Sequence, residues 1–251
     1  MNTDLIIRIF IMKNVYLIAG VAFQIEYKSK NTELLLKNYL CNIEPLHVVN
    51  LPSEEEIEFE CKMAKIDDYN KLENVAILRK ISTILLKKHS TVLLHSSAVS
   101  YNGKAYLFTA PSGTGKSTHV NNLKTVLGSK LEYINDDKPF VKIEEGSVTV
   151  YGSPWCGKHN LGSNVNRQLN SIIFLTRANE NYVKLIDGNE ALKPLIRQCF
   201  MLDNKNDLST LLALISKLVN SVSFYILGCT KELDSAFVTI KEIFKGDINE
   251  N

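Results

Sequence analysis

Apolar residues in the first part of the chain follow the patterns of β-strands. Residues 7–12 and 15–27 are short apolar runs, and between positions 56 and 63 apolar residues alternate with charged ones. A period of two is typical of a strand with one buried face, so we expect the intervening glutamates to face solvent. The pattern predicts a β-rich N-terminal lobe over residues 1–72. We interpret the acidic run at 54–56 as a solvated strand entry, in preference to a metal or peptide contact.

The period changes at residue 74. Apolar residues recur every three or four positions up to residue 89, which predicts one long helix. Beyond it, strand-like runs and helical stripes are interspersed. We expect strands at 91–101, 104–110, 131–135, 140–152, 171–178, 182–186 and 222–228, and helices at 120–127, 190–201, 207–220 and 232–244. This mixture predicts an α/β fold of the mixed α+β kind for a second domain over residues 73–251.

The segment APSGTGKS at residues 110–117 lies between a strand-like run and a helical stripe. Glycines let consecutive backbone N–H groups turn toward an anion, and the helix that follows directs its positive end at the same point. In phosphate-binding loops of this kind the lysine reaches the β- and γ-phosphates, and the hydroxyl after it ligates Mg²⁺. A glycine-rich turn capped by Ser117 is the alternative. The predicted nucleotide-binding residues are Ser112, Gly113, Thr114, Gly115, Lys116, Ser117 and Thr118.

A histidine upstream of this loop is a second candidate for the site. Asn102–Gly103 lies between two apolar runs and predicts a two-residue hairpin turn. Extending the register of that turn places His95 opposite Ala110, at the start of the loop. We therefore expect the ring near a γ-phosphate or the carboxylate of Asp136. A hydrogen-bonded core histidine is the alternative.

Two adjacent carboxylates, Asp136 and Asp137, follow the apolar run at 131–135. A phosphate loop needs an acidic partner, and two carboxylates suit two tasks. One accepts the proton of an attacking hydroxyl, and the other holds Mg²⁺. A turn is the alternative, because Asp-Asp is also good turn chemistry.

Composition excludes several classes of protein. The 29 basic and 27 acidic residues give a net charge of +2, which argues against a nucleic-acid or membrane-surface protein. The five cysteines are scattered, odd in number and never form a C-x-x-C pair, so we expect a reducing compartment. The apolar run at 15–23 is too short to span a bilayer. These features predict a cytoplasmic protein.

Together these residues resemble the C-terminal domain of HPr kinase/phosphorylase and its relatives, which share a fold with phosphoenolpyruvate carboxykinase. The resemblance rests on His95, the loop at 112–118, the sequence INDD at 134–137 and the predicted hairpin, and it extends over about residues 75–245. It implies a P-loop core with a mixed, largely antiparallel sheet. The segments YGSPWCGKHN and NSIIFLTRA further resemble the smaller peptide-modifying kinases of this superfamily, including those found with lasso-peptide precursors.

The resemblance implies a role for each matching residue. Lys116 and Ser117 would bind Mg²⁺ and the phosphates of ATP or GTP. Asp136 would be the base that deprotonates a substrate serine, and Asp137 would assist the metal. His95 would hold the γ-phosphate or orient the acid. The family's relatives assemble, so a homo-oligomer is also expected.

Two departures from the family pattern matter. The long glycine-rich signature linked to phosphorolysis has no match, which puts the reverse phosphorylase reaction in doubt. Lys158 stands where relatives often have an acid, so it is a candidate contact for a phosphate or an acidic substrate, as is Arg197; surface positions are the alternative for both.

Three functions compete at this point. The first is a kinase that transfers the γ-phosphoryl group to a hydroxyl, either a serine of a peptide or protein or a small alcohol such as free serine. The second is a non-catalytic nucleotide-binding regulatory or partner protein, which would need fewer acidic residues. The third is a lyase like phosphoenolpyruvate carboxykinase, for which the chain is too short and lacks a further ligand set for a second metal.

Overall fold

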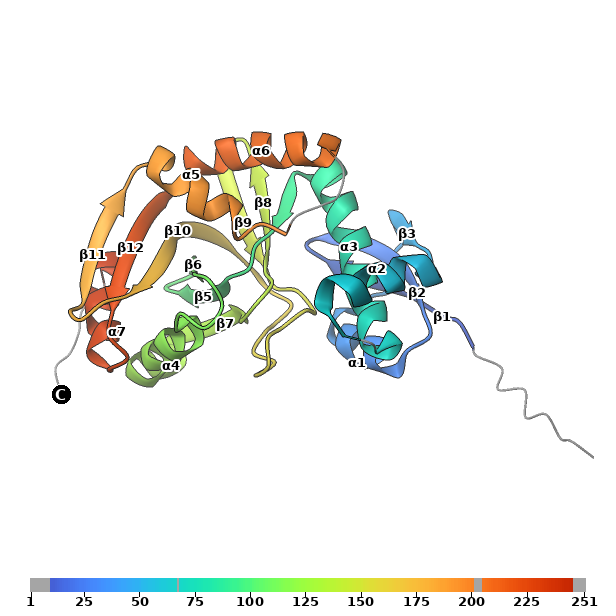
Figure 1. The fold of residues 1–251 in the computed structure, drawn as a ribbon, viewed down its shortest axis with the longest axis horizontal. Coiled ribbons are helices and arrows are strands. Elements are labelled where there is room, and N and C mark those ends of the chain that lie inside the picture. The colour runs from blue at the N-terminus through green and yellow to red at the C-terminus, as the bar shows by residue number, and fades with distance from the viewer. Residues whose placement is uncertain (1–9, 67, 201–204, 246–251) are drawn as a thin grey trace, which may run out of the picture. The chain divides into compact units, whose positions relative to one another are not determined.

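The computed structural model describes residues 10–66, 68–200 and 205–245 (Figure 1). The chain divides into two compact units, Met1–Ile81 and Ser82–Asn251. The division lies inside helix α3 (Tyr69–His89), later along the chain than the limit at residue 72 expected from the sequence. Among the described residues, no helix combines the length and apolar character needed to cross a membrane.

The first unit contains a three-stranded sheet in the order β1-β2-β3. Strands β1 (Met12–Ile18) and β2 (Val21–Tyr27) form an antiparallel hairpin, and β3 (His47–Val49) pairs with β2 in parallel. Helix α1 (Lys30–Leu36) and the short 3-10 helix η1 (Lys37–Tyr39) connect β2 to β3. The start of the apolar run expected at 7–12 lies outside the described residues.

The strand expected at residues 56–63 is wrong, because this segment forms helix α2 (Glu54–Ala64). A capping box begins the helix: the Glu56 N–H donates to Ser53 Oγ over 3.2 Å, and the Ser53 N–H donates to Glu56 Oε2 over 2.8 Å. The acidic side chains of the first turn stabilise the helix, because they lie at the positive end of its dipole. Glu60 is buried and pairs with Arg79 of α3 instead of facing solvent. The segment is helical although its apolar residues alternate, because a helix brings Glu60 to the side that faces Arg79 of α3.

The second unit is built on a nine-stranded mixed sheet in the order β4-β8-β9-β10-β6-β5-β7, with β12 also paired to β10 and β11 to β12. The long strand β10 runs parallel to β6 and β12, and the other pairings are antiparallel. The strands are β4 (Thr91–Leu93), β5 (Ser97–Tyr101), β6 (Lys104–Thr109), β7 (Leu131–Asn135), β8 (Phe140–Glu144), β9 (Ser147–Tyr151), β10 (Asn166–Arg177), β11 (Tyr182–Ile186) and β12 (Ser223–Cys229). The expected mixed α+β class is therefore correct.

Helices cover both faces of this sheet, in agreement with the alternation of side chains along its strands (Figure 1). Ile172 and Phe174 of β10 belong to a core with α5 (Gly188–Ile196) and α6 (Lys205–Val219). The intervening Ile173 and Leu175 belong to a second core on the opposite face. The helices of that second core are α4 (Lys116–Leu127), α7 (Asp234–Thr239) and the π-helical turn η3 (Ile240–Phe244). A 3-10 turn, η2 (Gly128–Lys130), links α4 to β7.

The hairpin of β5 and β6 has the register expected from its turn. Asn102 and Gly103 both have positive φ, 48° and 74°, as a type I′ turn requires. Tyr101 pairs with Lys104, and the ladder continues regularly to the pair of Ser97 and Phe108. Strand β6 then leads directly into the glycine-rich loop and α4, so the hairpin fixes where that loop begins.

Candidate functional site

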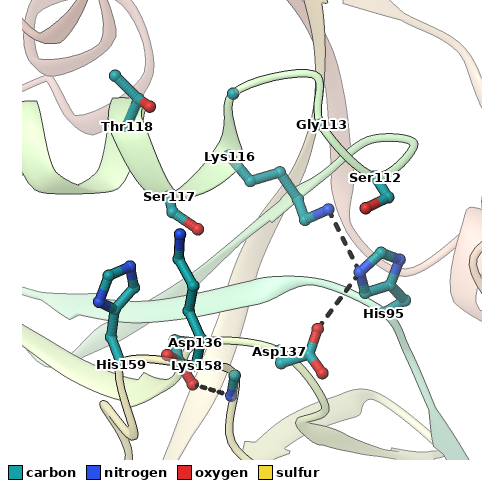
Figure 2. Close-up of a pocket in the computed structure, with 12 residues that line it drawn as sticks. His95, Ser112, Gly113, Lys116, Ser117, Thr118, Asp136, Asp137, Lys158 and His159 are labelled. Atoms are coloured by element: carbon teal, nitrogen blue, oxygen red, sulfur yellow. Dashed lines mark hydrogen bonds and ion pairs between the residues drawn. The ribbon is translucent and has the colours of Figure 1, made fainter.

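The glycine-rich loop forms one wall of a pocket of about 410 Å³ (Figure 2). Gly113 and Gly115 have φ values of 77° and 126°, which side chains other than glycine rarely adopt. Gly115 caps the N-terminus of α4, whose first N–H groups have no partner within the helix. The lining residues are His95, Ser112, Gly113, Gly115, Lys116, Ser117, Thr118, Asp136, Asp137, Gly157, Lys158 and His159.

Lys116 lies at the centre of this wall, at the start of α4. Its Nζ donates to the Ala110 carbonyl over 2.9 Å and lies 3.4 Å from His95 Nε2. The side chain is largely buried, and this burial lowers the lysine pKa, although the charge of Asp137 opposes the shift. An anionic ligand in the pocket would stabilise the charged ammonium that burial disfavours.

His95 lies beside the loop, as the register argument predicts. Its N–H donates to the Gln198 carbonyl over 2.8 Å, and its carbonyl accepts from Thr109 Oγ1 over 2.9 Å, so the backbone is held on both sides. The side chain is 40% exposed, which excludes the core-histidine alternative. The ring differs from expectation in one respect: Nε2 lies 3.3 Å from Asp137 Oδ1, so its carboxylate contact is Asp137 in place of Asp136.

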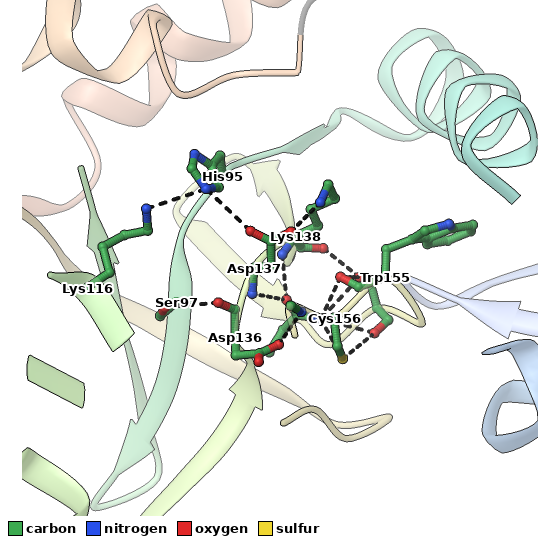
Figure 3. Close-up of polar contacts among 11 residues, drawn as sticks. His95, Ser97, Lys116, Asp136, Asp137, Lys138, Trp155 and Cys156 are labelled. Carbon is green, nitrogen blue, oxygen red and sulfur yellow. Dashed lines mark hydrogen bonds and ion pairs between the residues drawn. The ribbon is translucent and has the colours of Figure 1, made fainter. Parts of the chain in front are cut away.

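A buried asparagine shapes the turn that carries the two carboxylates. Figure 3 labels both carboxylates, Asp136 and Asp137, among their polar contacts. Asn135, the last residue of β7, accepts from the N–H groups of Asp137 and Lys138 over 2.8 and 2.6 Å. Its amide donates to the Ser153 carbonyl over 3.0 Å. The Asp-Asp turn considered as an alternative is therefore present, and it presents both carboxylates to the pocket.

The two carboxylates have different surroundings. Burial alone would raise the pKa of Asp137, but hydrogen bonds from His95 and Lys138 outweigh it and lower that pKa to about 2. Asp136 Oδ1 accepts the Gly157 N–H over 2.6 Å. Asp137 is therefore ionised at neutral pH and held by its two side-chain partners, whereas Asp136 is held by a backbone N–H.

Sequence reasoning missed four residues of this arrangement, one of which is His159, a lining residue of the pocket. Lys138 pairs with Asp137, and a β-carbon at Gly157 would lie 3.1 Å from Asp136 Oδ2, so glycine permits the close approach. Arg177 contacts the glycine-rich loop from β10. A basic residue at the end of a buried strand would have been a usable signal for Arg177, had the parallel pairing of that strand with β6 been known.

The remaining predicted contacts divide into those that reach the pocket and those that do not. Lys158 lines it and points toward Ser117, with His159 beside it (Figure 2). Thr114, predicted to bind nucleotide, does not line the pocket; its hydroxyl donates to the Pro111 carbonyl over 2.8 Å. Arg197 is exposed at the end of α5 and is not among the lining residues.

The oxygen donors of the pocket fit Mg²⁺. Ser117, Asp136 and Asp137 all line it, and Mg²⁺ prefers hard oxygen ligands. Within the described residues no group of three or more His, Cys, Asp or Glu side chains is arranged to hold a metal ion. Mg²⁺ commonly takes only one or two carboxylates from the protein and completes its shell with water and substrate phosphates. Ser117 and one carboxylate satisfy that requirement.

Comparisons with known proteins find a likeness among solved structures only. No family model and no curated protein matches the sequence. Among solved structures, the chain is similar to the Hpr(Ser) kinase/phosphatase from Coxiella burnetii, with a TM-score of 0.35 and 9% sequence identity over 61% of this chain and 97% of that chain. A TM-score of this size does not establish a shared fold, so the function is argued from the pocket itself.

Proposed function

We propose that the protein is an ATP-dependent phosphotransferase that moves the γ-phosphoryl group to a hydroxyl, a serine of a peptide or protein. One observation carries the proposal. A glycine-rich loop with its lysine, a histidine and a pair of aspartates come from three separate segments of the chain and line a single pocket. Positioning and charge neutralisation supply most of the rate in phosphoryl transfer, and these are the residue types that provide both.

The loop side of the pocket is the phosphate site. Backbone N–H groups of residues 113–117 and the N-terminus of α4 would surround the phosphate oxygens. Lys116 would exchange its bond to the Ala110 carbonyl for the β- and γ-phosphates. The nucleotide is ATP, with GTP as the alternative, because no described residue that lines the pocket distinguishes one base from the other.

Ser117 and Asp137 would hold Mg²⁺ between them and the phosphates. When bound, the ion neutralises negative charge on the β- and γ-phosphates as it shifts during transfer. Asp137 suits this role because it is ionised throughout the physiological pH range. His95 keeps that carboxylate in place through its 3.3 Å contact.

Asp136 would act as the base. Its Oδ1 is held by the Gly157 N–H. The acceptor hydroxyl oxygen attacks the γ-phosphorus, the bond from that phosphorus to the β,γ-bridging oxygen breaks, and the hydroxyl proton passes to Asp136. ADP and a phosphate ester leave the pocket. Lys158, on the opposite side from the loop, would contact the transferred group or an acidic acceptor.

The serine acceptor and a homo-oligomeric state rest on the sequence resemblance, and the cytoplasmic location rests on the composition of the chain. The five unpaired cysteines support a reducing compartment. A purely regulatory nucleotide-binding module remains the competing function, but it would need fewer acidic residues than the two aspartates that line the pocket.

Label transfer tests the proposal. The protein is incubated with Mg²⁺ and ATP labelled at the γ-phosphate, together with seryl peptides, free serine or no acceptor. We expect label to appear on a seryl hydroxyl, identified by mass spectrometry. Label on free serine alone would reassign the acceptor to small alcohols. Tight nucleotide binding without transfer to any acceptor or water would support the regulatory module instead.

A further inference from the structure

An arginine at the end of a strand contacts the outside of the glycine-rich loop. Arg177 is the last residue of β10 and lies beyond the final pairing of β10 with β6, at Phe174 and Thr109. Its side chain donates to two loop carbonyls, from Nη2 to Gly113 O over 2.5 Å and from Nε to Thr114 O over 3.3 Å. Because β12 pairs with β10 up to this residue, the arginine projects from a well-supported strand.

The β-carbon positions of the loop's two glycines are open space. A β-carbon built on Gly113 or Gly115 would meet no atom within 4 Å. Thr114 bonds to the Pro111 carbonyl through its N–H over 3.3 Å and its hydroxyl over 2.8 Å, which ties the loop only to itself. Glycines have the largest backbone freedom to lose, so a loop of this kind needs external hydrogen bonds to adopt one conformation. The Arg177 contacts supply two such bonds from a neighbouring strand.

The same contacts orient the loop dipoles. The guanidinium holds the carbonyls of Gly113 and Thr114 away from the pocket, which favours N–H groups that face into it. In the part of the chain that the structure describes, Arg177 forms no ion pair with a carboxylate. Its charge therefore remains uncompensated behind an anion-binding loop and adds to the local positive potential.

We propose that Arg177 is a positioning residue that holds residues 112–116 in the anion-binding conformation before the nucleotide arrives. The inference rests on the proposed function, since the anion is the triphosphate of a nucleotide. Arg177 does not line the pocket and touches no reacting atom. Its contribution is preorganisation, which acts on affinity more than on the chemical step.

The proposal predicts a separation between affinity and rate. Arg177→Ala should weaken binding of MgATP and of inorganic pyrophosphate about tenfold, the low end for hydrogen bonds from a charged donor because the side chain is exposed. The transfer rate at saturating nucleotide should stay close to wild type. Arg177→Lys, which can keep one of the two bonds, should give an intermediate affinity.

The test combines calorimetry with backbone ¹⁵N relaxation of Gly113, Thr114 and Gly115 in the nucleotide-free protein. Arg167→Ala is the control: it removes a partly exposed arginine at the other end of β10, where the side chain pairs with Glu132. We expect Arg177→Ala to lower the order parameters of the three loop amides and to weaken affinity, while Arg167→Ala changes neither.

Unchanged loop order parameters in Arg177→Ala would overturn the proposal, as would an equal loss of affinity in both arginine variants. The relaxation measurement needs no nucleotide, so it separates two failures. If the wild-type protein binds neither MgATP nor pyrophosphate, the proposed function is wrong, while a loosened loop in Arg177→Ala still supports the positioning role.

Discussion

At the scale of single residues, the pocket shows how neighbours in the sequence acquire different chemistry. Asp136 and Asp137 are adjacent, yet Asp137 contacts the side chains of His95 and Lys138 while Asp136 receives a backbone N–H from Gly157. The difference arises from the turn that Asn135 fixes, which directs the two carboxylates to different partners. These different surroundings fit the roles of base and metal ligand that we propose for Asp136 and Asp137.

Substituting the two aspartates separately should reveal these roles. Asp136→Asn should keep nucleotide affinity and slow phosphoryl transfer by about 10²–10⁴-fold, the usual cost of losing a general base. Asp137→Asn should raise the Mg²⁺ concentration needed for half-maximal rate, because a neutral amide is a poorer ligand. Steady-state kinetics over a Mg²⁺ titration measure both. If Asp137→Asn proves to be the variant that keeps affinity and loses transfer, the two roles are reversed.

At the scale of elements, the contact between α2 and α3 depends on a buried ion pair. The Glu60 side chain is 4% exposed and that of Arg79 is 19% exposed, and Arg79 Nη2 donates to Glu60 Oε2 over 3.3 Å. The Arg79 guanidinium also lies 4.9 Å from the centre of the Phe59 ring. Removing one partner would leave the other charge buried alone.

We therefore expect Arg79→Ala to reduce the free energy of unfolding of the first unit by about 3–5 kcal/mol. The double substitution Arg79→Met with Glu60→Met should cost much less, because it removes both charges and preserves apolar volume. Urea unfolding followed by far-UV circular dichroism compares the variants. Equal losses in the single and double variants would show that the pair is not the source of the effect.

A second contact between elements involves a buried histidine. His119 of α4 is 2% exposed and lies between two hydroxyls of α7, with Nδ1 3.1 Å from Ser235 Oγ and Nε2 3.0 Å from Thr239 Oγ1. Burial lowers its pKa from 6.5 to about 4. The unfolded chain therefore binds a proton between these pH values that the folded protein does not.

This difference predicts that stability falls as pH decreases from 6.5 toward 4, by about 2 kcal/mol at pH 5 and about 3 kcal/mol in full. Asp137 also has a strongly shifted pKa, but its protonation reduces stability only below its ordinary pKa of 3.8. Trp155, the only tryptophan, lies in the same unit, so its fluorescence reports this unfolding. His119→Gln should flatten the dependence between pH 7 and pH 5. An unchanged slope in that variant would rule out His119 as its cause.

Local signals predicted a large part of the molecule. The Asn102–Gly103 turn determines the register of its hairpin, so it correctly placed His95 at the loop. The glycines of the loop indicated a backbone conformation with positive φ. Features that depend on residues distant in the sequence could not be predicted. The alternation around Glu60 suggested a strand because its partner Arg79 was not known to be near.

At the scale of the whole molecule, sheet topology brings the site together. The glycine-rich loop follows β6, the aspartates follow β7, and His95 precedes β5, which lies between those two strands. The antiparallel β5–β7 pairing brings the start of β5 to the end of β7, where Ser97 Oγ donates to the Asp136 carbonyl over 3.0 Å. The pairing of β10 with β6, which the sequence does not reveal, adds Arg177 behind the loop.

The central claim, that this pocket transfers a phosphoryl group, is tested most directly by removing Lys116. Lys116→Ala should abolish nucleotide turnover and keep the thermal unfolding midpoint, because it removes a charge that burial disfavours. Lys124→Ala is the control: this lysine lies on the same helix, and its Nζ donates to the Leu131 carbonyl over 2.7 Å, away from the pocket. Turnover of γ-labelled ATP in the wild type and both variants gives the answer. We expect loss only in Lys116→Ala, and full turnover in that variant would contradict the account.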